Sequence, residues 1–206
     1  IHSTGSGQES LELRITEETI KEIHKFTVEK ILPADKCGVF RDKAVVVKNS
    51  HTGEVSFRPP EAQFILIQIQ DLLAFINLPA DKAGSPLIQD IHPVLKSGIV
   101  HYELVRIHPF LDGNGRVARA LSTLILFLGG YDIRKFFSLE EYFDSDASRY
   151  YSSLQSVANN GGDLTEWLAY FTQGLAIELA KIKEKVEKIS VDGKLRERLG
   201  GKPLLL

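Results

Sequence analysis

The chain has 206 residues, which fits a single domain. Its 43% hydrophobic residues can form a core and argue against intrinsic disorder, and its formal net charge of -2 gives no general attraction to nucleic acid. The only cysteine, Cys37, excludes a disulfide framework and a cysteine-based zinc site. It is typical of a reducing compartment, so we expect a cytoplasmic protein.

The two ends differ in character from the rest of the chain. Residues 1–12 lack the basic and apolar pattern of a signal peptide, and we expect a flexible arm or a cloning remnant there. Since the sequence contains no methionine, we do not expect Ile1 to be the natural start. Residues 191–206 predict a linker into a further C-terminal region. The longest apolar run, residues 120–130, is too short to span a membrane.

The first two elements are a helix and a hairpin. Isoleucines recur at roughly helical spacing over residues 13–32, and Thr16, which precedes two glutamates, is a candidate N-cap. The pattern changes at about residues 40–58. There the β-branched run Val45-Val46-Val47 is followed by the turn sequence NSHTG, and EVSF can return antiparallel, which predicts a β-hairpin.

Five later segments predict helices, which makes the expected fold class mainly α. Residues 59–79 and 85–107 have broad apolar faces, although FILIQIQ in the first also alternates as a strand does. Residues 117–128 carry the cleanest helical stripe and end at a pair of glycines. Residues 145–157 and 164–189 also have helical patterns. The apolar residues of the last segment alternate four and three apart, which at this length indicates a docked helix more often than a coiled coil.

The segment HPFLDGNGRVAR, His108 to Arg119, is the most informative part of the chain. DG and NG dipeptides are typical of hairpin turns, but both flanks have helical periodicity. A calcium loop beginning at Asp112 would place Arg116 at a ligand position. GNGRVA matches the dinucleotide-binding pattern G-x-G-x-x-A, yet an amphipathic helix stands where that pattern needs a buried strand. We therefore set these three interpretations aside.

What remains is a glycine-rich loop that leads into a helix starting near Arg116, an arrangement suited to phosphate. Glycine tolerates positive φ and lets the backbone N–H groups of Gly113 to Gly115 approach an anion. The helix start adds unpaired N–H groups and its dipole, and Arg116 and Arg119 project from one face of its first turn. Asp112 would repel phosphate unless Mg²⁺ bridged the two. The loop therefore predicts a site for a nucleotide di- or triphosphate.

His108 then has a catalytic role. A neutral imidazole beside a metal-bound phosphate can take a proton from an incoming hydroxyl. We interpret the other four histidines considered, His24, His51, His92 and His101, as structural. No carboxylate pattern accompanies His101 and His108, so we do not expect a zinc site.

The same segment resembles the signature of the Fic family, histidine–x–phenylalanine–x–acid–GNGR–x–x–arginine, at every specified position. The resemblance extends to the predicted hairpin, which corresponds to the family's flap, and covers about residues 13–190. It implies a mainly α helical bundle with a β-hairpin flap over the active site. It also implies a protein adenylyltransferase, which transfers AMP from ATP to a Ser, Thr or Tyr hydroxyl of a target protein and releases pyrophosphate.

The resemblance assigns roles to individual residues. His108 would be the general base, Asp112 the Mg²⁺ ligand and Phe110 a buried anchor for the loop. The phosphates would be bound by Gly113, Asn114, Gly115, Arg116 and Arg119. The rest of the nucleotide would be bordered by Val46, Val47, Tyr150, Tyr151 and Asn159, with Asn160 as the alternative to Asn159.

The resemblance also implies partners. A target protein would add a strand to the flap. An inhibitory helix or an antitoxin-like partner would restrain Arg119. The only approximate inhibitory pattern, Ser50 to Glu54, falls in the hairpin turn, and we interpret it as chance. A homodimer is kept open, and no membrane is expected.

Two alternative functions also stay open. One is transfer of another phosphate-linked group, such as UMP, phosphoryl or phosphocholine. The other is a non-catalytic nucleotide-sensing module attached to a DNA-binding domain beyond Leu206, which would be the only route to nucleic acid.

Overall fold

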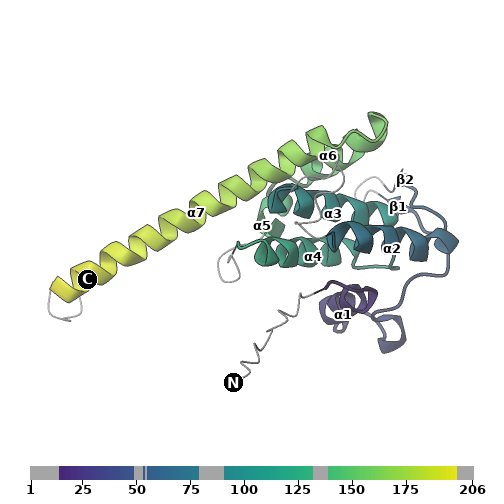
Figure 1. The fold of residues 1–206 in the computed structure, drawn as a ribbon, viewed down its shortest axis with the longest axis horizontal. Helices are drawn as coiled ribbons and strands as arrows, with labels where there is room; N and C mark the ends of the chain where they lie inside the picture. Colours follow the sequence, from purple (N-terminus) through teal and green to yellow (C-terminus); the bar gives the residue numbers. More distant parts are fainter. Residues whose placement is uncertain (1–13, 49–52, 54, 79–90, 132–138, 199–206) are drawn as a thin grey trace, which may run out of the picture.

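The computed structural model describes residues 14–48, 53, 55–78, 91–131 and 139–198, with side chains as far as residue 188. The expected arm, most of the hairpin turn (including Ser50, His51 and Glu54) and the last residues of the chain lie outside this part. The expected mainly α fold is confirmed (Figure 1). In chain order the elements are α1 (Glu17–Val28), η1 (Ala34–Lys36), β1 (Val47–Lys48), β2 (Val55–Phe57), η2 (Ala62–Phe64), α2 (Ile65–Ile76), α3 (Pro93–Ile107), α4 (Asn114–Leu128), α5 (Leu139–Ser145), α6 (Ala147–Asn159) and α7 (Thr165–Arg198).

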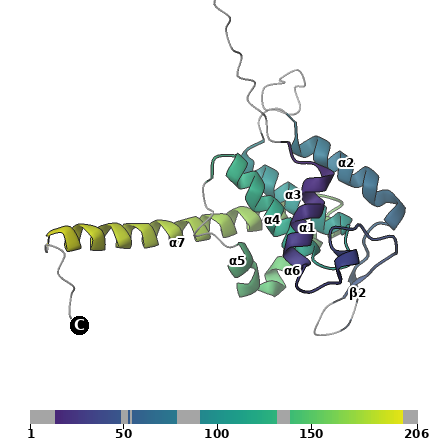
Figure 2. The same cartoon turned by 90° about the horizontal axis from the view of Figure 1, so that it is seen from below.

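Helix α1 begins where the sequence predicts. Thr16 is its N-cap, and the Thr16 side chain accepts a hydrogen bond from the backbone N–H of Thr19 at 3.2 Å. The Thr19 hydroxyl in turn accepts from the backbone N–H of Thr16, which completes a capping box. The buried face of α1 carries Ile20, His24 and Val28, spaced four residues apart. This face packs on α4, and Figure 2 shows α1 crossing α3 and α4.

Helices α3 and α4 form the centre of the fold, with α2 packed against α3 and α1 against α4. Their apolar faces meet in one core, and each of the four helices contributes to it at least one fully buried residue, for example Ile20, Ile69, Leu104 and Leu121. FILIQIQ is helical here, although it alternates as a strand would. The reason is that Ile65, Ile69, Leu72 and Ile76 of α2 share the face that this core buries. The loop between α3 and α4 adds Phe110 to the core.

A second core, rich in aromatic residues, joins α5, α6 and α7 to the ends of α3 and α4. Phe143, Trp167 and Phe171 are buried in it, and the indole N–H of Trp167 donates to the carbonyl of Gly98 at 2.8 Å. Helix α7 then runs far beyond the body of the molecule (Figure 1). It continues to Arg198, into the range 191–206 that was expected to be a linker. None of the helices in the described part is both long and apolar enough to cross a membrane.

The hairpin is present but shorter than the valine run suggests. Val47 pairs with Phe57 and Lys48 with Val55 in an antiparallel ladder, with an irregularity between the two pairs. Val46 precedes β1 and its side chain is 40% exposed. Gly53, with a φ of 72°, supplies a left-handed residue between the strands, as a tight turn requires. The prediction of a hairpin is therefore confirmed, with a shorter first strand.

His101 is fully buried against the aromatic rings of the second core and forms part of a hydrogen-bonded chain. Its Nε2 lies 3.0 Å from the Tyr150 hydroxyl, and its Nδ1 lies 3.3 Å from Ser122 Oγ. The Ser122 hydroxyl donates to the carbonyl of Ser97, so the chain is satisfied when Nδ1–H donates to Ser122 and Nε2 accepts from Tyr150. Burial, together with the smaller effect of the Arg119 charge, lowers the pKa of His101 to about 3. The structural interpretation of His101 is thus supported by its burial.

This burial predicts a pH dependence of stability. The unfolded chain protonates His101 below about pH 6.5, whereas the folded chain keeps it neutral to about pH 3, so stability is complete above pH 6.5 and is lost as the pH falls. Between pH 7.5 and pH 5.0 the linkage corresponds to about 2 kcal/mol in the free energy of unfolding. Urea unfolding of the wild type and of His101→Gln at both pH values measures it. A pH dependence that is equally steep in the variant would contradict the assignment.

Candidate active site

The segment His108 to Arg119 forms a turn bracketed by two left-handed residues. His108 ends α3 with a φ of 52°, and it is the only residue other than glycine with positive φ in the described part. Gly113 is the N-cap of α4 with a φ of 83°, and α4 starts at Asn114. The predicted loop that leads into a helix is therefore confirmed, with the helix two residues earlier than expected.

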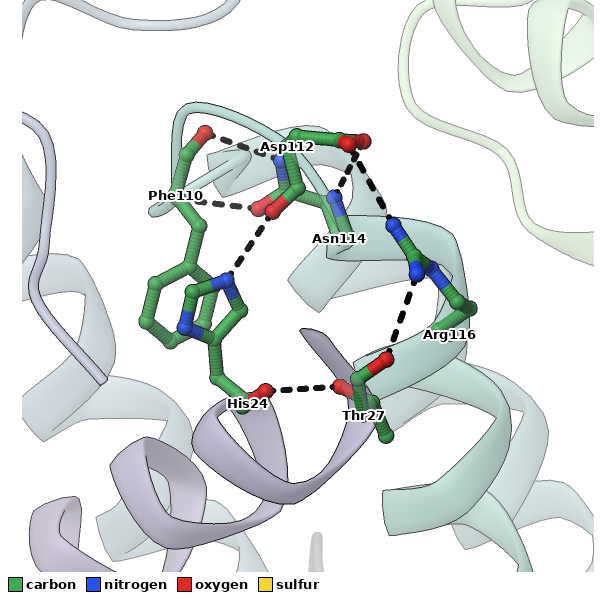
Figure 3. A network of polar contacts seen from close by, with 7 residues as sticks. His24, Thr27, Phe110, Asp112, Asn114 and Arg116 are labelled. Carbon is green, nitrogen blue, oxygen red and sulfur yellow. Dashed lines mark hydrogen bonds and ion pairs between the residues drawn. The ribbon is translucent and has the colours of Figure 1, made fainter. Parts of the chain in front are cut away.

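The loop is anchored from beneath by Phe110 and Asn114 (Figure 3). The Asn114 side chain is buried, accepts from the backbone N–H of Phe110 and donates to the Phe110 carbonyl, both at 2.9 Å. Phe110 is fully buried and stacks on the His24 ring at 3.8 Å between centroids. The expected role of Phe110 as a buried anchor is supported. The Asn114 side chain is occupied by this anchor, so only its backbone faces a ligand.

His24 holds the other end of the turn. Its Nδ1 accepts from the backbone N–H of Gly38 at 2.8 Å, so the proton lies on Nε2, which donates to the carbonyl of Asp112 at 3.0 Å. Burial is the main cause that lowers the pKa of His24, which keeps the ring neutral. The structural interpretation of His24 is supported, but this histidine orders the site loop as well as filling the core.

A second set of contacts closes a ring around the loop (Figure 3). The Arg116 guanidinium donates to the carbonyl of Thr27 at 3.2 Å and lies 3.3 Å from an Asp112 carboxylate oxygen. The other Asp112 oxygen accepts from the backbone N–H of Gly113. Because they lie in the first turn of α4, the backbone N–H groups of Asn114, Gly115 and Arg116 have no intrahelical acceptor. They are therefore available to an anion.

A cavity of about 190 Å³ lies above this loop, between the hairpin, α3, α4 and α6. Six of the residues predicted for the site line it: Val47, His108, Gly115, Arg119, Tyr150 and Tyr151. Gly113 and Asn114 lie beneath it in buried positions, and Val46 and Asn159 are exposed residues that do not line it. Ala158 lines the cavity in place of Asn159. Asp112 and Arg116 are also outside its lining, and Arg116 lines a neighbouring hollow instead. The structure thus brings half of the predicted residues to the cavity and leaves Val46 and Asn159 exposed away from it.

The geometry of His108 suits a base. Its Nδ1 lies 3.2 Å from the carbonyl of Val105, and because a carbonyl only accepts, Nδ1 carries the proton and Nε2 the lone pair. Burial is the main cause that lowers the pKa of His108, the Val105 bond and Asp112 raise it, and Arg41 lowers it. The ring is therefore neutral and able to accept a proton at Nε2 near neutral pH.

The left-handed backbone of His108 is unfavourable in free energy, and a hydrogen bond from Arg41 offsets this. Such a conformation costs about 1–2 kcal/mol for a residue with a Cβ. Arg41 Nε donates to the His108 carbonyl at 2.7 Å, a charge-assisted bond of a kind that contributes about 1.5–3 kcal/mol. The bond is thus strong enough to hold the conformation.

Arg119 lies between the cavity and a neighbouring hollow of about 330 Å³ that Arg116 and Thr123 also line. Its guanidinium forms an ion pair with Glu140 of α5 at 2.7 Å. The Glu140 side chain is 58% exposed, so the pair is weak. In this conformation a carboxylate on α5 competes with any anion for Arg119.

Asp112 fits the chemistry of a magnesium site, although it is the single acidic candidate at the loop. The described residues contain no cluster of three or more His, Cys, Asp or Glu side chains that could hold a metal by themselves. Mg²⁺ usually takes only one or two carboxylates and completes its shell with phosphate oxygens and water. The Asp112 side chain is 57% exposed beside the free N–H groups of α4, which fits a metal that arrives with a nucleotide.

Several cavity residues were not anticipated. Tyr102 and Val105 lie six and three residues before His108 on α3, and Phe57 faces the cavity from β2. The helical period back from His108 could have indicated the first two. Leu154 and Gln155 follow the two tyrosines on α6. Arg41, which lies outside the cavity but binds the backbone of His108, also gave no sequence signal, because its partners are backbone carbonyls.

Comparison with known proteins agrees with this geometry. A model of the Fic/DOC family matches residues 14–126. The protein adenylyltransferase fic-1 of Caenorhabditis briggsae is 31% identical over 153 residues, which are 73% of this chain. The match covers 27% of that relative, so the chain spans about a quarter of its length.

Solved structures share the fold. A fragment of Fic-1 from Caenorhabditis elegans matches 87% of this chain and 45% of its own, with a TM-score of 0.60 and 25% identity. A Fic-domain-containing signalling protein from Bacteroides thetaiotaomicron matches 82% of this chain and 62% of its own, with a TM-score of 0.64 and 26% identity.

The two glycines of the loop predict opposite effects on stability. A Cβ on Gly113 would lie 2.6 Å from Val28 Cγ1 in a left-handed conformation, whereas one on Gly115 would meet only Arg119 Nη1 at 3.5 Å. Gly113→Ala should therefore lower the free energy of unfolding by about 3 kcal/mol. The matched control Gly115→Ala should leave it unchanged or raise it by about 0.5–1 kcal/mol. Urea unfolding followed by circular dichroism measures both, and equal effects would contradict the geometry.

Proposed function

The chain belongs to the Fic/DOC family, and we propose that within it this protein is an adenylyltransferase that transfers AMP from ATP to a hydroxyl of a target protein. The observation that carries the proposal is the free Nε2 of a neutral, half-buried His108 in the cavity that Gly115 and Arg119 also line. The adenylyltransferase names of the relatives support it. Because the chain spans only part of those relatives, the activity of the whole protein is part of the proposal.

The proposed reaction uses His108 to deprotonate the target. The hydroxyl oxygen of a Ser, Thr or Tyr side chain attacks the α-phosphorus of ATP, and its proton passes to Nε2 of His108. The bond between the α-phosphorus and the oxygen that leads to the β-phosphate breaks, and pyrophosphate leaves. A neutral base is needed for this step, and the burial that lowers the pKa of His108 favours that form.

The start of α4 would bind the phosphates. The backbone N–H groups of Asn114, Gly115 and Arg116 and the positive end of the helix dipole can stabilise the charge that develops on the phosphate oxygens. The absence of a side chain at Gly115 lets a phosphate approach the backbone. Arg116 and Arg119 would contact the terminal phosphates once Glu140 releases Arg119.

The nucleoside would occupy the part of the cavity between the hairpin and α6. Val47, Phe57 and Leu154 give this part apolar walls, and Tyr151 is 61% exposed at its edge, where an aromatic ring can stack on a base. We assign Asp112 to hold Mg²⁺, which would neutralise phosphate charge when bound with the nucleotide. Tyr150 is an anchor more than a ligand, since its hydroxyl is bound to His101.

The hairpin would hold the target. An extended segment can add a strand to β1 or β2, which aligns a hydroxyl through main-chain hydrogen bonds without strict selection of side chains. Cys37 is a free thiol, and we place the reaction in the cytoplasm, a reducing compartment. An inhibitory helix or antitoxin-like partner at Arg119 and a homodimer stay proposals of the same kind.

Substitution of His108 tests the proposed base. With ATP labelled at the α-phosphate and Mg²⁺, the wild type should label protein, itself at least, and His108→Ala should lower the rate at least about 10²-fold. His92→Ala, which removes a histidine outside the cavity, should retain the label. Label from γ-labelled ATP instead would indicate phosphoryl transfer. ATP binding with no label on any protein would favour the sensing module.

Substitution of Glu140 tests the competition for Arg119. Glu140→Gln removes the ion pair, so the affinity for ATP should rise by up to about fivefold, since an exposed pair contributes at most about 1 kcal/mol. AMP, which lacks the terminal phosphates, is the matched ligand control and should bind equally to wild type and variant. Isothermal titration with both nucleotides measures this, and an equal gain for AMP would contradict the assignment.

A further inference from the structure

Arg41 is a buried cation that the nucleotide site does not use. Its side chain is 4% exposed, and among the described residues no carboxylate forms an ion pair with it. The guanidinium instead donates to four backbone carbonyls: His108 at 2.7 Å, Lys43 at 2.8 Å, Pro60 at 2.6 Å and Ile107 at 3.4 Å. Burial lowers its pKa, yet an arginine stays charged under these conditions. A buried charge held only by carbonyls fixes the position of those carbonyls closely.

The four carbonyls belong to two parts of the site. Lys43 precedes β1 and Pro60 follows β2, so they are the two ends of the hairpin. Ile107 and His108 are the last residue and the C-cap of α3, where a cation also interacts favourably with the helix dipole. The backbone N–H of Arg41 adds a bond to the carbonyl of Pro109 at 2.8 Å. One residue thus holds three consecutive carbonyls around His108 and both ends of the hairpin.

We propose that Arg41 is a positioning residue, which holds His108 in its left-handed conformation and fixes the hairpin relative to it. The hydroxyl of a target held by the hairpin then lies within hydrogen-bonding reach of the base. The inference rests on the proposed function. A left-handed C-cap points its side chain in a direction that a relaxed backbone would not allow, and Arg41 binds its carbonyl directly. Arg41 does not line the cavity, so it contacts neither the base atom nor the nucleotide.

The inference predicts different effects of Arg41 on the transfer of AMP and on the binding of nucleotide. The phosphate-binding groups lie on α4 and the nucleoside walls on α6 and the hairpin strands, and none of them bonds to Arg41. Because Arg41 also holds the ends of the hairpin that carries Val47 and Phe57, its loss should lower the turnover number much more than the affinity for nucleotide, to which α4 and α6 also contribute. Displacement of a base by about 1 Å can lower a rate by about 10²-fold.

The test compares Arg41→Lys with the wild type and with Arg149→Lys, a matched substitution on α6 away from the cavity. Lysine keeps the charge but cannot reach four carbonyls as the planar guanidinium does. With α-labelled ATP, Arg41→Lys should lower kcat about 10²-fold. Its KM for ATP and its affinity for a fluorescent ATP analogue should change much less than kcat does, as expected for an effect mainly on the transition state. Arg149→Lys should change none of these.

A second measurement, the pKa of the His108 ring, does not require transfer of AMP. Arg41 lowers the pKa of the His108 ring, so Arg41→Ala should raise it, and Arg41→Lys should leave it nearly unchanged. Titration of the His108 ring by NMR measures this. The other charged or titratable groups near the ring are unchanged in both variants: Asp112 in the loop, Tyr102 and Arg106 on α3, Arg119 on α4, and Tyr150 and Tyr151 on α6.

Each outcome decides the inference. Unchanged kcat in Arg41→Lys, an equal loss of nucleotide affinity, or a variant that does not fold would overturn it, the last because Arg41 would then be a residue of the fold alone. A wild type that labels no protein would overturn the proposed function instead. In that case the NMR titration still decides whether Arg41 acts on His108.

Discussion

The site depends on one constraint: the turn between α3 and α4 must present the N–H groups at the start of α4 to a ligand while polar groups on its inner side are bound. Helix α1 and the loop itself satisfy this from beneath. His24 binds the Asp112 carbonyl, and the Asn114 side chain binds both backbone groups of Phe110. Because these bonds all lie on the inner side, the outer N–H groups at the start of α4 are left as donors. Neutral His24 and buried Asn114 are thus as much part of the site as the residues that face the cavity.

The position of the cavity follows from the two cores. One core holds Phe110 and fixes the loop with His108, and the other holds Tyr150 and fixes α6. Helices α3 and α4 contribute to both, so the base and the tyrosine wall are held by a common pair of helices. The buried chain from Tyr150 through His101 to Ser122 links α6 to that pair directly. A ligand between the two cores therefore meets walls that are rigid relative to each other.

The sequence predicted the loop, its flanking helices and the hairpin because each has a local cause. Thr16 caps its own helix, the four-residue spacing of the buried residues in α2 outweighs the strand-like alternation, and Gly113 occupies a conformation that favours glycine.

Local sequence patterns were insufficient where the position of a side chain depends on residues distant in the chain. The family resemblance placed Asn159 beside the nucleotide, but the phase of α6 turns Ala158 to the cavity. Asn114 was expected to bind phosphate, and only the position of Phe110 shows that its side chain is occupied. Arg41 binds backbone carbonyls, and because every residue has one, the sequence does not identify these partners. Helix α7 also passes residue 190, and ion pairs between side chains four residues apart, such as Glu184 and Lys188, support its exposed part before that point.

The contact between His24 and Asp112 also has a consequence for the order of folding. These residues are 88 positions apart, and the Gly38 bond to the same ring comes from a third segment. Contacts over such a separation form after local helices, since the intervening chain must first be brought together. Helices α3 and α4 can therefore form as a pair while the turn between them is still unordered. We expect the loop to reach its final geometry when α1 docks, because only then do the bonds to His24 and Thr27 form, so phosphate binding there should follow that step of folding.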